Sequence, residues 1–472
     1  MKLPKGFKTL VEPYEYQKEA MIFGMTKPVA GILLDLGLGK TYVAINIARY
    51  RIQFCNVKKV LVVCPTSILL NWEDQIRKYS EYRAVILHAD RNTRIRRFKE
   101  NAHFYIINYE ALYPFIKHLL HLKPEMVIFD ESSRFIKNYK AKRTKAAIAI
   151  ADRCKYKLIL TGTFISNRPT DIWSQFRVLD GGLTFGNNYY SFLNFFFRKV
   201  RIGAWFKYVL KTKRVNSLQK GIYNLCIRKS KREVLKDLPD RIYNKISIEL
   251  GELGPIYKDV ESSILTEIDT LNGSLSLELQ NILTKLLRLQ QITAGFIKQG
   301  DEEKELIYQP KLDAVVDRIE SVLEEEESVI VWCRFLKSIS LISNRLKDKH
   351  IKYITMSGLD KDKFSKWKTF QKSKNINVFI AQIESGGIGI ELFKEDSDPD
   401  KSQHMIFYEN TWSMDVRTQA FGRNDRIGQK SVCVYTDLVI KNTIDEKILN
   451  AIQRKEKIAD LIMKNGVKEF LK

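Results

Sequence analysis

The segment LLDLGLGKTY, residues 33–42, joins an apolar run to a stretch with helical spacing. Gly37 and Gly39 allow a sharp turn in which main-chain N–H groups point inward. Free N–H groups and the dipole at a helix N-terminus attract phosphate. Lys40 is then placed to reach the β- and γ-phosphates of a nucleotide, and the Thr41 hydroxyl to hold Mg²⁺. The segment indicates a nucleotide site, although a glycine turn with a solvated lysine has the same local sequence.

Other short apolar runs have the same form, and each is closed by polar residues or glycine. They are KVLVVCPTS (59–67), HFYIINYE (103–110), MVIFDESS (126–133), KLILTGTF (157–164), SVIVWCRF (328–335), NVFIAQIESGG (377–387) and HMIFYENTW (404–412). Continuous apolar runs are typical of parallel strands that helices cover on both faces. The runs form two groups, separated by a mostly helical stretch. We therefore predict an α/β fold with two parallel-sheet lobes.

The charge of the chain indicates a polyanionic partner. Lys and Arg number 79 against 55 Asp and Glu, a formal net charge of +24. The basic residues concentrate in segments 91–100, 207–214 and 227–236. Nucleic acid is the first candidate and an anionic membrane surface the second. We expect no membrane span, because no apolar run is long enough. Scattered cysteines without a CxxC pair, and an N-terminus without a hydrophobic signal core, predict a cytoplasmic location.

Acidic and basic residues supply the remaining candidate chemistry. Asp130 and Glu131 close a predicted strand, where Asp130 can hold Mg²⁺ through water and Glu131 can accept a proton from an attacking water. The segment QAFGRNDRIGQ (419–429), if helical, places Gln419, Arg423 and Arg426 on one face. Two arginines there suit a finger role on a transferring phosphoryl group, with a surface salt-bridge pair as the alternative.

The region 184–210 is rich in aromatic residues. Stacking on nucleic-acid bases is one interpretation. Packing together into a small helical core is the favoured one, because aromatic residues clustered this densely usually contact one another.

These segments together resemble the motifs of superfamily-two helicases, and among them the Swi/Snf-type double-stranded DNA translocases. The resemblance covers roughly residues 10 to 450, with the motifs in the family's order. They are PYEYQKEA (the glutamine motif), DLGLGKT (I), CPTSILLNW (Ia), DESSRFIKN (II), LTGTFISN (III), VIVWCRF (IV), ESGGIGIEL (V) and QAFGRNDRIGQ (VI), and IRKSKREVLKDLP and NTIDEKIL resemble further family segments. The combination of GLGKT, PTSILLNW and RIGQ is specific to the Swi/Snf branch.

The resemblance implies RecA-like lobes, ATP and Mg²⁺ as cofactors, and a set of site residues. The implied catalytic residues are Lys40, Thr41, Asp130, Glu131, Arg423 and Arg426, with Thr41 and Asp130 holding Mg²⁺. The implied nucleotide contacts are Tyr16, Gln17, Gly37, Leu38, Gly39, Lys40, Thr41 and Gln419, with Gln17 reading the adenine. DNA backbone contacts would come from Thr66, Ser67, Asn108, Tyr109, Arg334, Ser385 and Gly386, and coupling from Thr161, Gly162 and Thr163.

The chain departs from the family pattern at a few positions. The family's phosphate loop has no glycine at the position of Leu34, so its absence is expected. Ser132 and Ser133 replace the usual Ala and His, of which the histidine is thought to couple ATP and nucleic-acid states. We expect Ser133 to be able to donate a replacement hydrogen bond. Phe164 replaces a proline, and Glu391 replaces an asparagine and is expected to point away from phosphate.

The predicted organisation is an ATP-binding lobe at 1–250 with a helical insert near 180–225, a connecting helical region at 251–310 and a second lobe at 311–472. The resemblance implies a minimal bacterial or phage-like motor, a DNA-dependent ATPase that translocates on duplex DNA and remodels DNA or protein–DNA complexes. Its DNA would be duplex or branched, and no protein partner is predicted. A strand-separating or branch-migrating helicase is the alternative, and a catalytically silent DNA-binding scaffold is an alternative of another class.

Overall fold

The computed structural model describes residues 2–162, 168–202, 205–234, 241–269, 275–300, 302–360, 362–384, 392, 401–423 and 431–463. The chain divides into two compact units. The first consists of Met1–Lys236 with Lys455–Lys472, and the second of Asp237–Arg454. The predicted boundaries at 250 and 310 stay a prediction.

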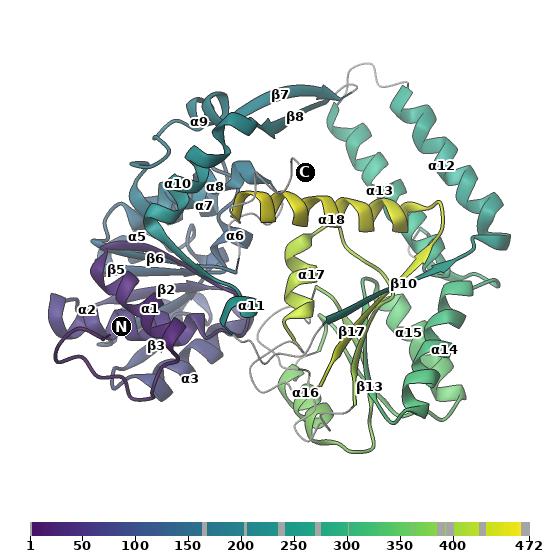
Figure 1. The fold of residues 1–472 in the computed structure, drawn as a ribbon, viewed down its shortest axis with the longest axis horizontal. Coiled ribbons are helices and arrows are strands. Elements are labelled where there is room, and N and C mark those ends of the chain that lie inside the picture. The colour runs from purple at the N-terminus through teal and green to yellow at the C-terminus, as the bar shows by residue number, and fades with distance from the viewer. Residues whose placement is uncertain are drawn as a thin grey trace. The chain divides into compact units, whose positions relative to one another are not determined.

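The first unit is built on a seven-stranded sheet in the order β3-β4-β2-β5-β6-β1-β9 (Figure 1). All its neighbouring strands are parallel. The strands are β1 (Val29–Leu34), β2 (Val60–Cys64), β3 (Ala84–Ile86), β4 (Phe104–Asn108), β5 (Met126–Asp130), β6 (Tyr156–Leu160) and β9 (Cys226–Lys229). Every residue of β2, β4 and β5 is buried, which confirms that the continuous apolar runs are strands covered on both faces.

Helices pack around this sheet, with α1 against α2 and α2 against α3. They are α1 (Glu15–Thr26), α2 (Lys40–Cys55), α3 (Leu69–Tyr79), α4 (Arg91–Arg97), α5 (Ile116–Leu122), α6 (Ser132–Phe135), α7 (Lys142–Ala151), α8 (Ile172–Asp180), α9 (Tyr189–Phe196), α10 (Val215–Leu225) and α11 (Lys231–Val234). Short 3₁₀ turns η1 (Thr66–Ile68) and η2 (Tyr109–Ala111) follow β2 and β4. In α3 the buried residues Leu69, Trp72 and Ile76 share one face, which fixes the helix on the core.

The aromatic region forms an insert in the first unit. The rings of Phe185, Phe192 and Phe196 lie 5.1 to 5.5 Å apart and pack against one another, as their density predicts. The insert also contains an antiparallel pair, β7 (Phe197–Ile202) and β8 (Trp205–Leu210), which the sequence analysis missed. Aromatic and β-branched residues favour strands, but densely clustered aromatic residues also pack into helical cores, so composition did not separate the two.

The second unit is built on a six-stranded sheet in the order β10-β17-β16-β13-β15-β14, again with all neighbours parallel. The strands are β10 (Arg241–Ile248), β13 (Ser328–Cys333), β14 (Tyr353–Met356), β15 (Val378–Gln382), β16 (Gln403–Phe407) and β17 (Cys433–Ile440), and β11 (Phe296–Gln299) forms a separate pair with β12 (Glu302–Glu305). Two parallel sheets, one in each unit, confirm the predicted fold class.

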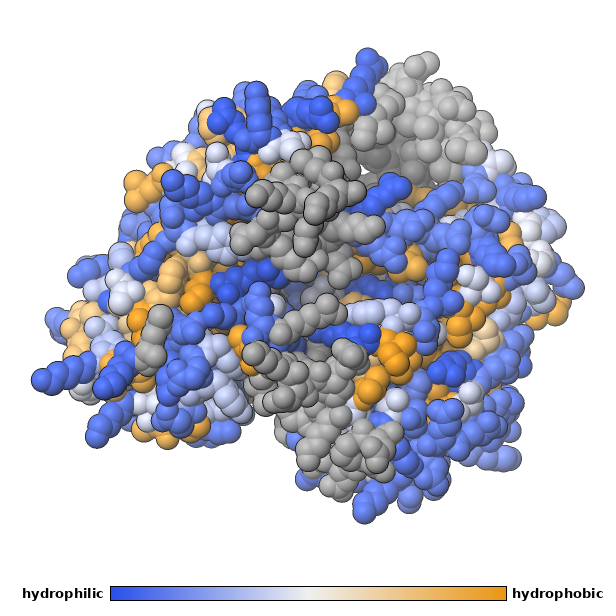
Figure 2. Space-filling view, in the orientation of Figure 1, coloured by the Kyte–Doolittle hydropathy of each residue, from blue (hydrophilic) through white to orange (hydrophobic). Residues whose placement is uncertain are grey.

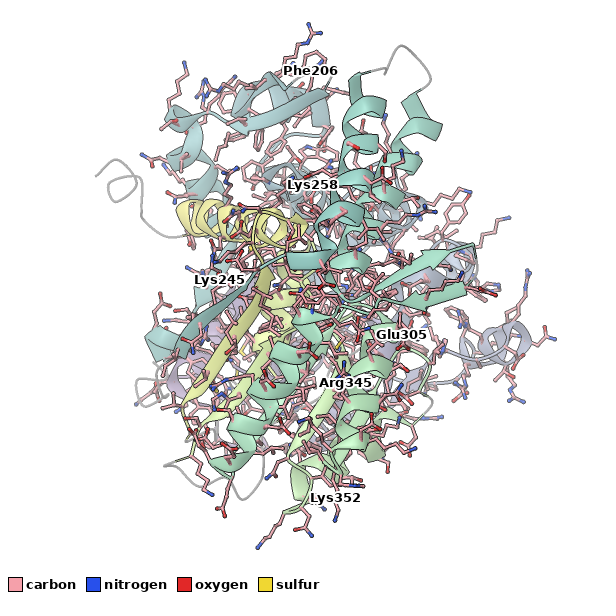
Figure 3. All side chains as sticks on the ribbon, turned by 90° about the vertical axis from the view of Figure 1, so that its right-hand side faces the viewer. Phe206, Lys245, Lys258, Glu305, Arg345 and Lys352 are labelled. Atoms are coloured by element: carbon pink, nitrogen blue, oxygen red, sulfur yellow. The ribbon has the colours of Figure 1, made fainter. Side chains whose placement is uncertain are left out.

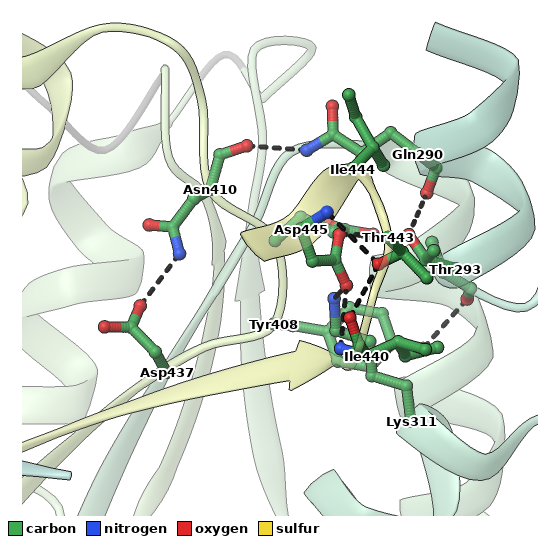
Figure 4. Close-up of polar contacts among 12 residues, drawn as sticks. Gln290, Thr293, Lys311, Tyr408, Asn410, Asp437, Ile440, Thr443, Ile444 and Asp445 are labelled. Atoms are coloured by element: carbon green, nitrogen blue, oxygen red, sulfur yellow. Dashed lines mark hydrogen bonds and ion pairs between the residues drawn. The ribbon is translucent and has the colours of Figure 1, made fainter. Parts of the chain in front are cut away.

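The helices of the second unit are α12 (Gly254–Asp269), α13 (Leu275–Thr293), α14 (Pro310–Glu324), α15 (Leu336–Asp348), α16 (Lys363–Lys372), α17 (Met414–Phe421) and α18 (Ile444–Met463), whose end belongs to the first unit. A buried polar network around Asp445 joins three of them to the sheet (Figure 4). Asp445 accepts hydrogen bonds from Lys311 Nζ at 2.7 Å and from Thr293 Oγ1 at 3.1 Å. Tyr408 adds a hydrogen bond to the Ala294 carbonyl at 2.8 Å.

The surface is predominantly polar. Hydrophilic residues cover most of the face shown in Figure 2. Exposed basic side chains of the second unit include Lys258, Arg345 and Lys352, which are labelled in Figure 3. Among the helices of the described residues, none combines the length and apolar character needed to cross a membrane.

Candidate functional site

The predicted phosphate loop lies between the end of β1 and the first residue of α2. Gly37 and Gly39 have φ of 87° and 79°, the left-handed region that favours glycine. A Cβ atom at Gly39 would lie 2.6 Å from Gln17 Nε2, so a larger residue has no room there. Lys40 is buried at the start of α2, and its Nζ donates a hydrogen bond to the Leu34 carbonyl at 2.9 Å. The loop, the helix start and the lysine thus occur together as predicted.

Gln17 braces this loop from α1. Its Nε2 donates to the Leu38 carbonyl at 3.2 Å, and its Oε1 accepts from the Tyr14 main-chain N–H at 3.1 Å. Tyr16, beside it, is buried, and burial raises the pKa of its hydroxyl to about 12. The adenine-reading role of Gln17 stays a prediction. Its contact with the phosphate loop is a second role that the sequence analysis missed.

The basic segment 227–236 also anchors the loop. β9 pairs with β1, and the Asp35 N–H donates to the Lys229 carbonyl at 3.2 Å. The Lys231 N–H donates in turn to Asp35 Oδ2 at 3.0 Å. In the sequence this segment is a charge cluster that also resembles a family segment, and its pairing with a strand almost 200 residues away is visible only in the tertiary structure.

Asp130 and Glu131 lie at the carboxyl end of β5, as predicted. Asp130 Oδ1 accepts from the Glu131 N–H, and Oδ2 from Trp72 Nε1, both at 2.9 Å. Burial raises the pKa of the Asp130 carboxyl to about 7, and the Glu131 charge acts in the same direction. The Lys40 charge opposes this shift, which places the lysine within electrostatic reach of Asp130. Glu131 has φ of 51°, a backbone conformation that is uncommon outside glycine and frequent at functional sites.

The donor set at this edge fits Mg²⁺. The Asp130 carboxylate and the Thr41 hydroxyl are oxygen donors, the type that this hard cation prefers. The two described hydrogen bonds to the Asp130 carboxylate come from neutral groups, so a nearby cation would stabilise its charged form. Asp130 and Thr41 therefore remain the candidate metal-binding residues.

The serines that replace the family's Ala and His are both buried and hydrogen-bonded. The Ser133 hydroxyl lies 2.8 Å from Thr161 Oγ1, and the Ser132 hydroxyl donates to Gln175 Oε1 at 3.0 Å. The replacement hydrogen bond expected of Ser133 therefore exists, and it reaches a predicted coupling residue. Gly162 lies beside the start of the phosphate loop, since a Cβ there would lie 3.9 Å from the Leu34 carbonyl oxygen. Thr163 and Phe164 lie outside the described residues.

The four DNA-contact candidates of the first unit differ in accessibility. Thr66 and Ser67 are exposed in η1. Asn108 is buried, and its Nδ2 donates to Glu110 Oε2 at 2.9 Å. Tyr109 is 0% exposed, and its hydroxyl donates to the Asp130 carbonyl at 2.7 Å. The Tyr109 side chain therefore points into the core, and its predicted DNA contact stays a prediction.

In the second unit, Arg334 is half-buried at the end of β13. Its N–H donates to Glu409 Oε2 at 2.6 Å, and its guanidinium donates to Gln290. Burial lowers the pKa of Arg334, whereas the charges of Glu384 and Glu409 raise it. Its predicted DNA contact stays a prediction. Ser385, Gly386 and Glu391 lie outside the described residues.

The helix that carries Gln419 is shorter than expected. α17 ends at Phe421, with Gly422 as its C-cap, so Arg423 lies beyond the helix. The helical face predicted to hold Gln419 and Arg423 is therefore wrong, because Gly422 lies at the end of the helix and not within it. Gln419 and Arg423 are buried, and Arg426 lies outside the described residues.

A residue of α17 that the sequence analysis missed holds this helix on the sheet. Both terminal nitrogens of Arg417 donate to the Asp437 carboxylate of β17, each at 2.6 Å. Asp437 also accepts from Asn410 Nδ2 at 2.8 Å. Such a two-pronged pair fixes orientation as well as distance. The sequence around Arg417 gave no indication of this ion pair, because the position of β17 beside α17 was not known.

Comparisons with known proteins agree with these motifs. The family model of the SNF2-related domain matches residues 16–295. An uncharacterized ATP-dependent helicase of Mycoplasma genitalium, MG018, is 28% identical over 97% of this chain and 43% of its own length. The putative ATP-dependent helicase/translocase YwqA of Bacillus subtilis is 25% identical over 98% of this chain and 50% of its own length. The chain thus spans about half or less of the length of these relatives.

Among solved structures, the SWI2/SNF2 ATPase core of Sulfolobus solfataricus in complex with dsDNA is 23% identical, covering 99% of this chain and 96% of that chain with a TM-score of 0.46. The family model covers more than half of the chain and includes its phosphate loop and its acidic pair. The chain therefore belongs to the SNF2-related family, the Swi/Snf-type branch of the superfamily-two ATP hydrolases.

Proposed function

We propose that this chain is a DNA-stimulated ATPase that translocates along duplex DNA and thereby remodels DNA or protein–DNA complexes. The observation that carries the proposal is the arrangement of the first unit. A glycine phosphate loop with Lys40 lies within electrostatic reach of Asp130, the buried member of an acidic pair at the carboxyl edge of a parallel sheet. Ligands bind at this edge in such sheets.

Hydrolysis follows from the chemistry of these side chains. The N–H groups of the loop and the start of α2 bind the phosphates, and Lys40 exchanges the Leu34 carbonyl for a phosphate oxygen. Glu131 orients the attacking water and takes its proton. Asp130 and Thr41 would hold Mg²⁺, which shields the phosphate charge when bound. A scaffold without catalysis needs none of these groups, so their joint presence argues against that alternative.

Arg423 and Arg426 of the second unit are proposed as fingers that neutralise charge on the transferring phosphoryl group. We expect either arginine-to-alanine variant to lower DNA-stimulated turnover by orders of magnitude, with a smaller effect on ATP affinity. Single-turnover kinetics with a parallel nucleotide-binding titration would measure both. Normal turnover in both variants would leave a structural role for the two arginines.

The DNA part of the proposal rests on charge and on relatives. The net charge of +24 suits contacts with phosphates, which give affinity without sequence information and suit a motor that moves along any sequence. Thr66 and Ser67 offer exposed hydroxyls at the carboxyl edge of the first sheet. A solved SWI2/SNF2 core was determined with dsDNA, which favours duplex as the substrate class here too. Bacterial relatives favour a cytoplasmic location, and the phage-like source stays a prediction.

Strand separation or branch migration is the second candidate, because the Mycoplasma and Bacillus relatives are named helicases. Three DNA substrates distinguish the two candidate functions, provided that the rate of ATP turnover is the same on each. They are a triplex whose third strand is displaced by a passing duplex motor, an overhang duplex that requires strand separation, and a four-way junction. Displacement from the triplex without unwinding of the overhang supports translocation. Unwinding without triplex displacement would overturn it, and activity on junctions alone would favour branch migration.

A further inference from the structure

The buried carboxylate of Asp130 is held by a tryptophan from another helix. Trp72 is 1% exposed on α3, and its indole Nε1 donates to Asp130 Oδ2 at 2.9 Å across 58 residues of sequence. An indole N–H is a donor only, and a buried one needs an acceptor. Here the acceptor is the candidate metal-binding carboxylate and not a main-chain carbonyl. The tryptophan therefore sets the direction in which that carboxylate faces.

Tyr109 holds the main chain at the same residue. Its hydroxyl donates to the Asp130 carbonyl at 2.7 Å. Its ring stacks on Phe135 of α6 with centroids 4.4 Å apart and planes 2° from parallel. α6 is the helix that follows Glu131, so Tyr109 fixes both the end of β5 and the first element after it. Side chain and main chain of Asp130 are thus held by two residues outside β5.

Both anchors continue into turns at the edge of the sheet, where Thr66 and Ser67 of η1 and Glu110 of η2 are exposed. Trp72 lies on α3, which follows Thr66 and Ser67 of η1, and Tyr109 follows Asn108 directly. The two turns meet at the Glu110 carboxylate, which accepts from Thr66 Oγ1 at 3.4 Å and from Asn108 Nδ2 at 2.9 Å. The same two segments are therefore joined at the surface through Glu110 and in the core through Asp130.

We propose that Trp72 and Tyr109 are positioning residues that hold Asp130 in register with these two turns, so that DNA binding at the turns changes how Asp130 holds its metal. The inference rests on the proposed function, since it takes the turns as DNA contacts and Asp130 as a Mg²⁺ ligand. It gives this chain a physical connection between the two sites beside the Ser133–Thr161 contact, where the family's histidine is absent.

Two conservative substitutions test the anchors, and the chain supplies a matched control for each. Tyr109→Phe deletes one O–H and keeps the ring, whereas Trp72→Phe removes the indole N–H together with the five-membered ring that carries it. Trp173→Phe is the control for the first, because Trp173 is also buried and donates to the Gly186 carbonyl at 3.0 Å. Tyr105→Phe is the control for the second, because the buried Tyr105 donates to the Glu100 carbonyl at 2.6 Å.

The first measurement is the affinity for a metal ion and not the rate of ATP turnover. Mn²⁺ replaces Mg²⁺, and its affinity for the protein–nucleotide complex is followed by electron paramagnetic resonance, with and without duplex DNA. We expect Trp72→Phe to weaken Mn²⁺ about 10-fold or more, the order seen when partners of metal ligands are lost. We also expect the effect of duplex on Mn²⁺ affinity to shrink in both variants, while affinity for metal-free nucleotide and for DNA stays within about 2-fold. Both controls should match the parent.

A merely structural role gives a different result. Equal losses in the control variants, or parent-like Mn²⁺ affinity and DNA response in both test variants, would overturn the proposal. Tyr109→Phe serves as the test if Trp72→Phe fails to fold. If the parent protein binds Mn²⁺ and nucleotide but its ATPase does not respond to DNA, the proposed function fails. The Mn²⁺ titration without DNA would then still decide whether the two residues position Asp130.

Discussion

Two buried aspartates, one in each unit, have opposite surroundings. Asp445 accepts from the Lys311 ammonium at 2.7 Å and from Thr293, so its charge is paired within the protein. Asp130 accepts instead from the neutral Trp72 indole and the Glu131 main-chain N–H. Burial raises the pKa of Asp130 to about 7, with the Glu131 charge acting in the same direction, and no cation among the described residues forms an ion pair with it. A paired buried carboxylate connects helices, whereas one with neutral donors suits a site that a cation completes.

The lysines whose charges act on the two aspartates, Lys40 on Asp130 and Lys311 on Asp445, give the largest expected contrast. Lys40→Ala should reduce ATP hydrolysis by about 10³-fold or more, because the lysine is proposed to bind phosphates in the transition state. Folding stability and DNA binding should change little, since among the described residues the Lys40 ammonium donates a hydrogen bond to the Leu34 carbonyl alone. A coupled ATPase assay and thermal unfolding would measure both. Lys59→Ala is a control, because Lys59 also donates to a main-chain carbonyl of this unit. Unchanged ATP turnover in Lys40→Ala would contradict the assignment of the nucleotide site.

Lys311→Ala should have the reverse effect. It leaves the Asp445 carboxylate buried and unpaired, which costs about 3–5 kcal/mol of folding stability. Urea denaturation followed by circular dichroism measures the loss. The double variant Lys311→Met with Asp445→Leu should recover much of it, because replacing both charges removes the desolvation cost. A loss below about 1 kcal/mol for the single variant would show that the Lys311–Asp445 ion pair contributes little to folding stability.

The variant Glu131→Gln, at the residue after Asp130, separates catalysis from ATP binding. Glutamine keeps the size and polarity but cannot take a proton from water. Turnover should fall about 10²-fold or more, while ATP affinity stays near that of the parent. Single-turnover hydrolysis and equilibrium nucleotide binding measure the two separately. Loss of ATP affinity with unchanged turnover of bound ATP would assign Glu131 a structural role.

The smallest expected effect concerns pH and a third buried carboxyl, Glu409, which binds the Arg334 N–H and Ser338. Burial raises its pKa from 4.5 to about 7. A raised carboxyl pKa stabilises the folded protein below the unfolded value and loses that contribution as pH rises through the folded value. Between pH 6 and 7 the parent should therefore lose about 1 kcal/mol more stability than Glu409→Gln. Urea denaturation at both pH values tests this, with parallel pH dependences as the contradicting outcome.

The sequence predicted the local elements of the site well, because they depend on local chemistry. Apolar runs gave the strands, and two glycines with a lysine gave the phosphate loop. The sequence did not predict features that depend on contacts between distant segments. Tyr109 has the sequence position of a DNA contact, yet its hydroxyl bonds the Asp130 carbonyl in the core. The helix expected to continue beyond Gly422 ends at Phe421, with Gly422 as its C-cap.

The sequence by itself determined two parallel sheets, the phosphate loop and the acidic pair, since burial pattern and turn chemistry are written in consecutive residues. Only the tertiary structure decided which polar groups meet. Trp72 reaches Asp130 across 58 residues, and Lys311 reaches Asp445 across 134. A buried polar group is stable only with a partner, and that partner is chosen by which segments the folded sheets bring together. The chain carries two buried aspartates, and their surroundings in the fold make one a link between helices and the other a candidate metal ligand.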